Sequence, residues 1–164
     1  AAELAEVLAL GPRPGKADHA ALPSLDLVMR ECLRLITPVP GVVRKTVRDT
    51  DVLGYHIPRD TLVSVNLQGT HRLQEYWPDP KRFDPERFAE DRHEDKVHRH
   101  AWVPFGGGVH KCIGLHFGGM QVKAVMYQLL LRYRWTTPAD YEMPIDWTSL
   151  PRPKDGLPVQ LVAL

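Results

Sequence analysis

The sequence predicts a mainly α-helical domain that also contains a small antiparallel β-sheet. Residues 24–36 and 113–135 carry apolar side chains at the spacing of helix faces. Residues 42–66 instead contain short β-branched runs separated by turn residues, which is typical of strands. The 164 residues are one domain's worth of chain, so we expect a single unit over residues 1–164.

The amino-acid composition indicates which partners are excluded and in which cellular compartment we expect the protein. The chain has 21 Lys and Arg against 20 Asp and Glu, without the basic excess of a nucleic-acid-binding protein, so we expect no nucleic-acid partner. No run is long and apolar enough for a membrane span, and the two cysteines suit a reducing compartment. We therefore expect a soluble, cytoplasmic protein. The chain starts without methionine, which leaves a membrane anchor upstream of it open.

The first elements are expected to be helical. Residues 1–10 are rich in Ala, Leu and Glu and predict the end of a helix that stops at Gly11-Pro12, before a polar loop over 11–23. Ser24 is expected to cap a second helix, which Pro38 ends. One apolar stripe is predicted on this helix, formed by Leu25, Val28, Met29, Cys32, Leu33 and Ile36.

Three kinds of sequence pattern follow in the rest of the chain. Residues 42–48, 55–57 and 61–66 predict the small sheet, and Asp51, Gly54 and Pro58-Arg59-Asp60 separate its strands. The long, proline-punctuated and charged stretch 72–104 predicts a functional loop. Residues 113–135 are apolar on two faces and predict one long buried helix, followed by a tail that ends in a strand-like VQLVAL.

The segment most informative about chemistry is residues 105–114, FGGGVHKCIG. It predicts a glycine-rich turn that delivers Cys112 to the N-terminus of the long helix, where amide groups and the helix dipole favour an anionic sulfur. A buried anionic sulfur needs a cation, and a haem iron supplies one. Three other interpretations stay open on these residues alone. They are a phosphate-binding turn, although the usual Gly-Lys-Ser/Thr is missing, an inert buried cysteine, and a disulfide with Cys32.

This segment resembles the haem-ligand signature of the cytochrome P450 family, Phe-x-x-Gly-x-(Arg/His)-x-Cys-x-Gly. Every specified position is filled, by Phe105, Gly108, His110, Cys112 and Gly114. Glu31 and Arg34 resemble the family's Glu-x-x-Arg pair, although alone they fit an ordinary solvated helix pair. Arg87, in Pro-Glu-Arg-Phe, resembles the family's third member of that network.

The resemblance implies the C-terminal, proximal haem portion of the P450 fold, so residues 1–164 would be a single partial domain whose N-terminal part is missing. It implies haem b with Cys112 as the iron ligand and with further cofactor-binding residues at Arg44, Phe105, Gly106, His110, Gly114 and Gly118. Arg44 and His110 would reach the propionates, whereas Arg44 alone also fits a solvated strand arginine. Glu31, Arg34 and Arg87 would form a structural network, and no catalytic residue is assigned.

The implied activity is a monooxygenase that inserts one oxygen atom from O₂ into an apolar substrate. Five side chains are expected to border the substrate: Val39, Val42, Val43, Trp147 and Leu150. MQVKA at 120–124 faintly resembles bacterial sterol-demethylase relatives. Electrons would come from a ferredoxin or flavoprotein reductase that docks on the cysteine side, where Lys96, Arg99 and Lys111 form a basic face.

A second class of function is a non-catalytic truncated fragment with weak or no haem binding. The family's oxygen-activating threonine lies on a helix before the Glu-x-x-Arg helix, and no threonine precedes Glu31. A metal site is also conceivable, because His93, His98 and His100 cluster together. Without cysteine or carboxylate support, a solvated charged loop is favoured for these histidines.

Overall fold

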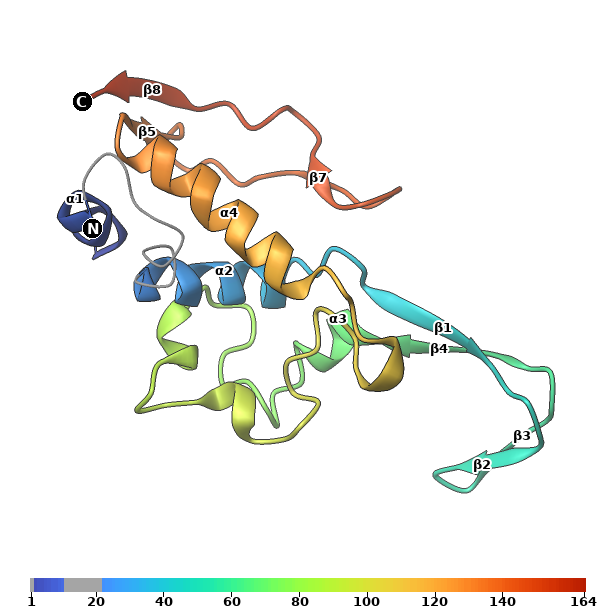
Figure 1. The fold of residues 1–164 in the computed structure, drawn as a ribbon. Helices are drawn as coiled ribbons and strands as arrows, with labels where there is room; N and C mark the ends of the chain where they lie inside the picture. Colours follow the sequence, from blue (N-terminus) through green and yellow to red (C-terminus); the bar gives the residue numbers. More distant parts are fainter. Residues whose placement is uncertain (1, 11–21) are drawn as a thin grey trace.

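The computed structural model describes residues 2–10 and 22–164 (Figure 1). Among these residues, three helices of nine residues or more, α1 (Ala2–Leu10), α2 (Pro23–Leu35) and α4 (Leu115–Leu130), accompany four two-stranded antiparallel sheets. The expected class of helices with small antiparallel sheets is confirmed. Figure 1 shows α4 running between the C-terminal strands on one side and α2 on the other, with the irregular stretch 72–104 beyond α2. Within the described ranges, no helix is both long and apolar enough to span a bilayer.

A small apolar core joins α1, α2 and α4. It contains Val7, Leu22, Leu25 and Tyr127, with Leu10, Met126, Leu130 and Leu131 packed against it. Pro23 starts α2, a position where its missing N–H costs nothing. The expected Ser24 cap was wrong, because Ser24 Oγ donates to Glu6 Oε1 at 2.6 Å and so fastens α2 to α1. Gly11-Pro12 and nearly all of the expected 11–23 loop lie outside the described residues.

Helix α2 is buried on its polar side as well as at Leu25 of the expected apolar stripe. Cys32, in the expected apolar stripe, is exposed, whereas Glu31 and Arg34 on the other side have no solvent exposure. The stretch 72–104 packs on this polar side and supplies hydrogen-bond partners for both charges. Burial of charged groups is tolerated only when they are paired in this way.

The strands between 41 and 66 form two separate antiparallel ribbons instead of the single expected sheet. Their members are β1 (Gly41–Lys45) with β4 (Leu62–Asn66) and β2 (Thr50–Val52) with β3 (Tyr55–Ile57). Gly41 lies opposite Asn66, and Lys45 lies opposite Leu62. Asp60 has a φ of 64°, a backbone region that aspartate tolerates in turns.

The stretch 72–104 follows the short helix α3 (Leu67–Thr70) and contains only two 3₁₀ turns, η2 (Pro85–Phe88) and η3 (Glu94–Lys96). A second apolar core lies beneath it, formed by Trp77, Phe88 and Ala101 with Leu27, Tyr76 and Trp102 against them. Aromatic burial of this kind anchors a segment that has little regular secondary structure.

The last helix is shorter than the expected 113–135. Helix α4 ends at Leu130, and β5 (Tyr133–Thr136) then pairs with β8 (Gln160–Ala163), which confirms the strand-like tail. The residues between them include the small ribbon of β6 (Ile145–Asp146) and β7 (Arg152–Pro153). Arg132 N donates to Leu129 O in a tighter final turn, after which the backbone extends.

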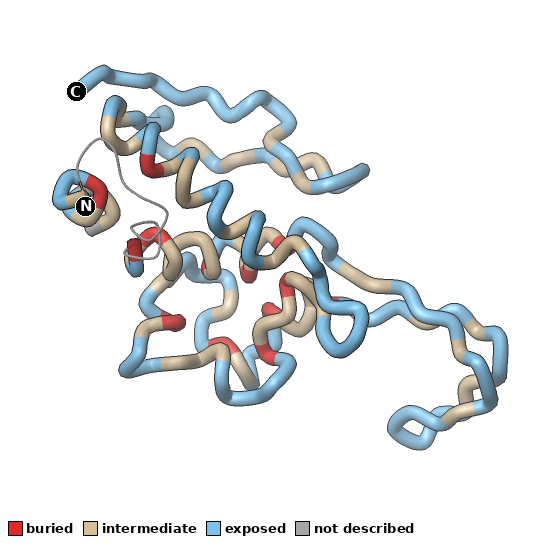
Figure 2. Tube along the Cα trace, viewed as in Figure 1, coloured by how far each residue is buried: buried red, intermediate tan, exposed pale blue. Residues whose placement is uncertain are grey.

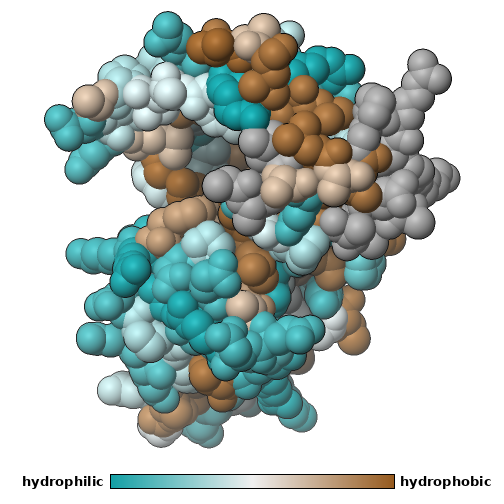
Figure 3. Space-filling view, turned by 90° about the vertical axis from the view of Figure 1, so that its left-hand side faces the viewer, coloured by the Kyte–Doolittle hydropathy of each residue, from teal (hydrophilic) through white to brown (hydrophobic). Residues whose placement is uncertain are grey.

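Helix α4 is also less buried than its two apolar faces predict. Tyr127 is its only buried residue, and Figure 2 shows the exposed and half-buried turns between its ends. Its exposed apolar side chains are Phe117, Met120, Val122, Val125 and Leu129. Figure 3 shows hydrophobic residues gathered in the upper part of the displayed face above a mainly hydrophilic lower part. An apolar surface of this extent indicates a further contact.

Candidate functional site

The loop 105–114 presents Cys112 just before α4. The amide of Cys112 donates to Phe105 O at 2.9 Å, which closes the loop, and Lys111 N donates to Gly108 O at 3.2 Å. Gly106 and Gly108 have φ values of +69° and +66°, a backbone region that strains other residues. The turn therefore needs its glycines to bring the cysteine to this place. Cys112 is an exposed free thiol, not a buried one, and Cys32 is likewise free.

Cys112 lies on the wall of a cavity of about 340 Å³. The other lining residues come from α2 and its C-terminal end, from β1, from α3 and from the cysteine loop: Leu33, Pro38, Val39, Val42, Arg44, Leu67, Pro104, Phe105, Gly106 and His110. Six sequence-predicted cofactor or substrate residues meet Cys112 here, namely Arg44, Phe105, Gly106, His110, Val39 and Val42. The cavity thus joins one thiol, an apolar lining and basic groups.

The two basic residues of this cavity have no carboxylate partner among the described residues. Arg44 Nη1 donates to the carbonyl of Val43 at 2.9 Å and forms no ion pair there. His110 ends the 3₁₀ turn η4 (Gly108–His110) and is exposed. Both side chains are therefore available to an anionic group that enters the cavity.

The glycines near Cys112 differ in what surrounds them. A Cβ on Gly114 would lie 3.6 Å from Cys112 Sγ, in van der Waals contact with the sulfur. A Cβ on Gly118 would meet no described heavy atom within 4 Å, whereas one on Gly119 would touch Met29 Cε at 3.6 Å. Gly119 therefore packs against a methionine of α2, whereas Gly118 faces open space among the described residues.

Three residues that were expected to border the substrate do not line the cavity at Cys112. Val43 is exposed on β1 between Val42 and Arg44, which both line it. Trp147 and Leu150 are exposed in the turn between β6 and β7. Their expected role stays a prediction.

Glu31 and Arg34 form a bidentate ion pair in the interior. Arg34 Nε and Nη2 donate to the two oxygens of Glu31 at 2.7 and 2.8 Å. Arg34 also donates to the carbonyls of His71 and Pro80, both at 2.8 Å. The pair is not a solvated one, since both side chains are fully buried. It fastens the irregular stretch 72–104 to α2.

Arg87 joins this network at longer range. Its Nε lies 3.5 Å from Glu31 Oε1, whereas its closest ion pair is with Glu94 Oε2 at 2.7 Å. It also donates to Asp79 O at 2.8 Å. Sequence reasoning missed Glu94, which was hidden in the charged run EDRHEDK and carries no motif of its own.

The side chain of Arg30 also connects α2 to the cysteine loop. The guanidinium of Arg30 lies 4.4 Å from the ring centroid of Phe88 and 4.9 Å from that of Trp102, and it pairs with Asp95 at 2.7 Å. Trp102 in turn packs edge-on against Phe105, with 6.1 Å between centroids. Sequence reasoning missed this aromatic sandwich, whose members are far apart in the chain.

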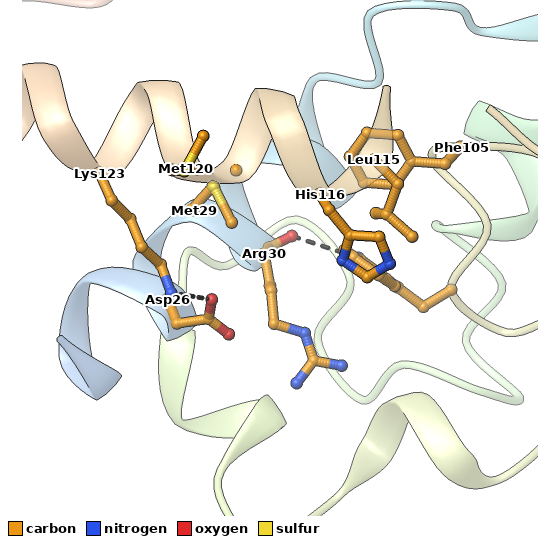
Figure 4. Close-up of a pocket in the computed structure, with 10 residues that line it drawn as sticks. Asp26, Met29, Arg30, Phe105, Leu115, His116, Met120 and Lys123 are labelled. Carbon is orange, nitrogen blue, oxygen red and sulfur yellow. Dashed lines mark hydrogen bonds and ion pairs between the residues drawn. The ribbon is translucent and has the colours of Figure 1, made fainter. Parts of the chain in front are cut away.

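A second cavity of about 390 Å³ lies between α2 and α4 (Figure 4). Asp26 of α2 and Lys123 of α4 are ion-paired across it at 2.7 Å. Phe105 lines both this cavity and the one at Cys112. Within the described residues, no group of three or more His, Cys, Asp or Glu is placed to hold a metal ion, His93, His98 and His100 included.

Comparison with known proteins agrees with this geometry. A sequence model described as Cytochrome P450 matches residues 1–159. The protein named cytochrome P450 136 of Mycobacterium tuberculosis is 51% identical over 85% of this chain and 29% of its own length. A sterol 14alpha-demethylase of Mycolicibacterium vanbaalenii is 38% identical over 70% of this chain and 25% of its own length. The chain thus spans less than a third of the curated relatives that it matches.

A solved structure shares the fold. It is described as retinoic acid bound cyanobacterial CYP120A1, and its TM-score is 0.91 at 35% identity over 99% of this chain and 38% of that one. Members of this family bind haem, which fits a cavity that combines one accessible thiol, apolar walls and two basic side chains. The family match over nearly the whole sequence and the shared fold show that the chain belongs to the cytochrome P450 family.

Proposed function

We propose that this chain is the haem-binding portion of a haem-thiolate monooxygenase, with the Cys112 sulfur as the iron ligand. The observation that carries this proposal is the convergence of Cys112, Arg44 and His110 on one apolar cavity. An accessible sulfur and two basic side chains, unpaired among the described residues, on the same apolar cavity suit a ligand that carries both a metal cation and anionic groups. Haem b supplies both, as an iron and as two propionates.

Five residues of the cavity, together with Gly114 and Gly118, would hold the cofactor. Cys112 would hold the iron through its sulfur, and Arg44 and His110 would donate hydrogen bonds to the propionates. Phe105 and Gly106 would contact the ring from the same loop, and Gly114 and Gly118 would leave room beside it. When bound, the haem supplies activation of dioxygen, and thiolate ligation favours cleavage of the O–O bond. We assign no catalytic acid or base to the chain.

We also propose an apolar substrate. Val39 and Val42 line the cavity beside Cys112, and no carboxylate lines it. The relatives support a lipid, steroid or terpenoid class, because one is named a sterol demethylase and another was solved with retinoic acid bound. Val43, Trp147 and Leu150 would border such a substrate further from the iron.

The electron donor is proposed to be an acidic ferredoxin or flavoprotein reductase. Arg99, His100 and Lys111 line a shallow cavity of about 260 Å³ alongside the glycines of the cysteine loop. Lys96 is exposed in the same stretch of chain, with its Nζ 3.2 Å from His93 Nε2. A basic surface next to the iron ligand accelerates encounter with an acidic partner.

We further propose that residues 1–164 are one partial domain, the C-terminal portion of a longer protein. The apolar side chains exposed on α4 and the greater length of the relatives support this proposal. In the longer protein, the remaining part would cover these side chains and supply the other wall of the haem cavity.

The test is the absorption spectrum of the reduced, carbon-monoxide-bound full-length protein. The wild type should show the red-shifted Soret band of thiolate ligation. Cys112→Ala should lose it, whereas Cys32→Ala should keep it, because Cys32 lies on α2 outside the cavity. An unchanged band in Cys112→Ala would refute the ligand assignment.

A further inference from the structure

His71 is fully buried between the C-terminal end of α2 and the start of the cysteine loop. Both of its ring nitrogens have partners. Nδ1 lies 2.8 Å from Thr37 Oγ1, just after α2, and Nε2 lies 2.9 Å from the backbone N of Val103. The side chain therefore connects the helix that carries the Glu31–Arg34 pair to the segment that leads into Phe105.

The direction of these hydrogen bonds is fixed by the partners. A backbone N–H can only donate, so His71 Nε2 carries no proton and accepts from Val103. In the neutral ring Nδ1 then holds the hydrogen and donates to Thr37 Oγ1. The Thr37 hydroxyl donates a hydrogen bond to Leu33 O at 3.0 Å. Each donor in this series of three hydrogen bonds therefore has an acceptor.

The surroundings keep the ring in this neutral form. Burial, and next the positive charge of Arg34, lower the pKa of His71 from 6.5 to about 4. Arg34 Nη1 also donates to the His71 carbonyl at 2.8 Å. The buried ion network and the cysteine loop are thus joined through this one residue.

Val103 is connected to Cys112 by two backbone hydrogen bonds. Val103 O accepts from Gly106 N at 2.9 Å, which forms the turn that contains Phe105. Phe105 O then accepts from Cys112 N, also at 2.9 Å. A shift of Val103 would consequently move the carbonyl to which the cysteine amide is tied.

We propose that His71 is a positioning residue of the cysteine loop, which fixes the sulfur of Cys112 through the acceptor that it offers to the Val103 amide. His71 does not line the cavity at Cys112, so it acts through the loop and not by contact with a bound group. This inference rests on the proposed role of Cys112 as the haem ligand.

Replacing His71 by glutamine or by asparagine tests its hydrogen bonds to Val103 and to Thr37 one at a time. Glutamine carries an oxygen four bonds from Cα, as Nε2 is in histidine, so His71→Gln retains an acceptor for Val103. Asparagine carries its amide three bonds from Cα, as Nδ1 is, so His71→Asn retains the link to Thr37 and loses Val103. The two variants are matched in polarity and differ in the link that they keep.

The experiment uses the full-length, haem-loaded protein and has two readouts. Hydrogen exchange of the Val103 amide should be faster on the order of tenfold in His71→Asn and close to wild type in His71→Gln. The thiolate-type Soret band of the reduced carbon monoxide complex should convert in part to the band of haem without thiolate in His71→Asn only. Wild-type behaviour of His71→Asn in both readouts would overturn the inference, and so would equal losses in both variants. A wild-type protein without the thiolate band would instead overturn the proposed function, and the exchange comparison would still test the Val103 link.

Discussion

Replacing Arg34 by alanine should impair folding of the protein and not merely lower its catalytic turnover. Arg34 has no solvent exposure and makes five hydrogen bonds, two of them to Glu31. The other three go to the carbonyls of His71, Pro80 and Arg82. These carbonyls lie within the irregular stretch 72–104 or immediately before it. The single guanidinium therefore fixes the backbone at three separate points of this region.

The cost follows from what the substitution leaves behind. Glu31 would stay buried as a carboxylate with one amide donor, Asp84 N at 2.9 Å, and with Arg87 Nε at 3.5 Å. Breaking a buried ion pair in this way lowers the free energy of unfolding by about 3–5 kcal/mol. Water that enters the space left by the side chain would replace part of the hydrogen bonding that the three carbonyls lose. A domain is stable by about 5–15 kcal/mol, so roughly a fifth or more of its stability would be lost.

The assay is urea unfolding together with haem content per mole of purified full-length protein. Arg34→Ala should be haem-poor and strongly destabilised, and Arg34→Lys should lie in between, because lysine keeps the charge without the bidentate fork. Arg72→Ala is the matched control: Arg72 is exposed and donates to Leu35 O at 3.3 Å, so its loss should cost about 0.5 kcal/mol or less. Stable Arg34→Ala protein with full haem and only lower turnover would refute a structural role.

Three further outcomes are expected. The folded state keeps His71 neutral while the unfolded chain takes up a proton below pH 6.5, so stability should fall by about 3 kcal/mol between pH 6.5 and pH 4. Urea titrations at several pH values measure this, and the same slope in His71→Gln would contradict it. The double substitution Arg99→Glu and Lys111→Glu should raise the KM for an acidic electron donor and reduce the dependence of that KM on salt. The kcat at saturating donor should not change. An unaltered KM would contradict the proposed docking face. Residues 1–164 alone should aggregate, or take up haemin weakly and consume electrons without product; coupled hydroxylation by this piece would exclude the partial-domain proposal.

Local patterns accounted for much of the site. The loop 105–114 could be interpreted from sequence because its glycines, cysteine and following helix are consecutive, and their geometry is set by neighbours in the chain. Glu31 and Arg34 are similarly one helical turn apart, so their pairing follows from helix geometry. Their burial does not follow, because it depends on a stretch some fifty residues later, as the 53-residue separation of Glu31 from Asp84 shows.

Other features depend on contacts that no local pattern contains. The apolar run continues through Leu131, Tyr133 and Trp135, so periodicity alone extends the last helix, whereas pairing of Tyr133 with Ala163 draws the chain into a strand. His71 has partners 34 and 32 residues away, and nothing in its immediate sequence distinguishes it from the solvated histidines that follow. Ser24 had an alternative partner in Glu6, which displaced the expected cap.

The central claim is that the sulfur of Cys112 binds the haem iron, and iron-edge X-ray absorption of the ferric full-length protein tests it most directly. The wild type and Cys32→Ala should both show one sulfur scatterer in the first coordination shell, and Cys112→Ala should show only nitrogen and oxygen. A sulfur scatterer that persists in Cys112→Ala, or that is missing from the wild type, would contradict the assignment.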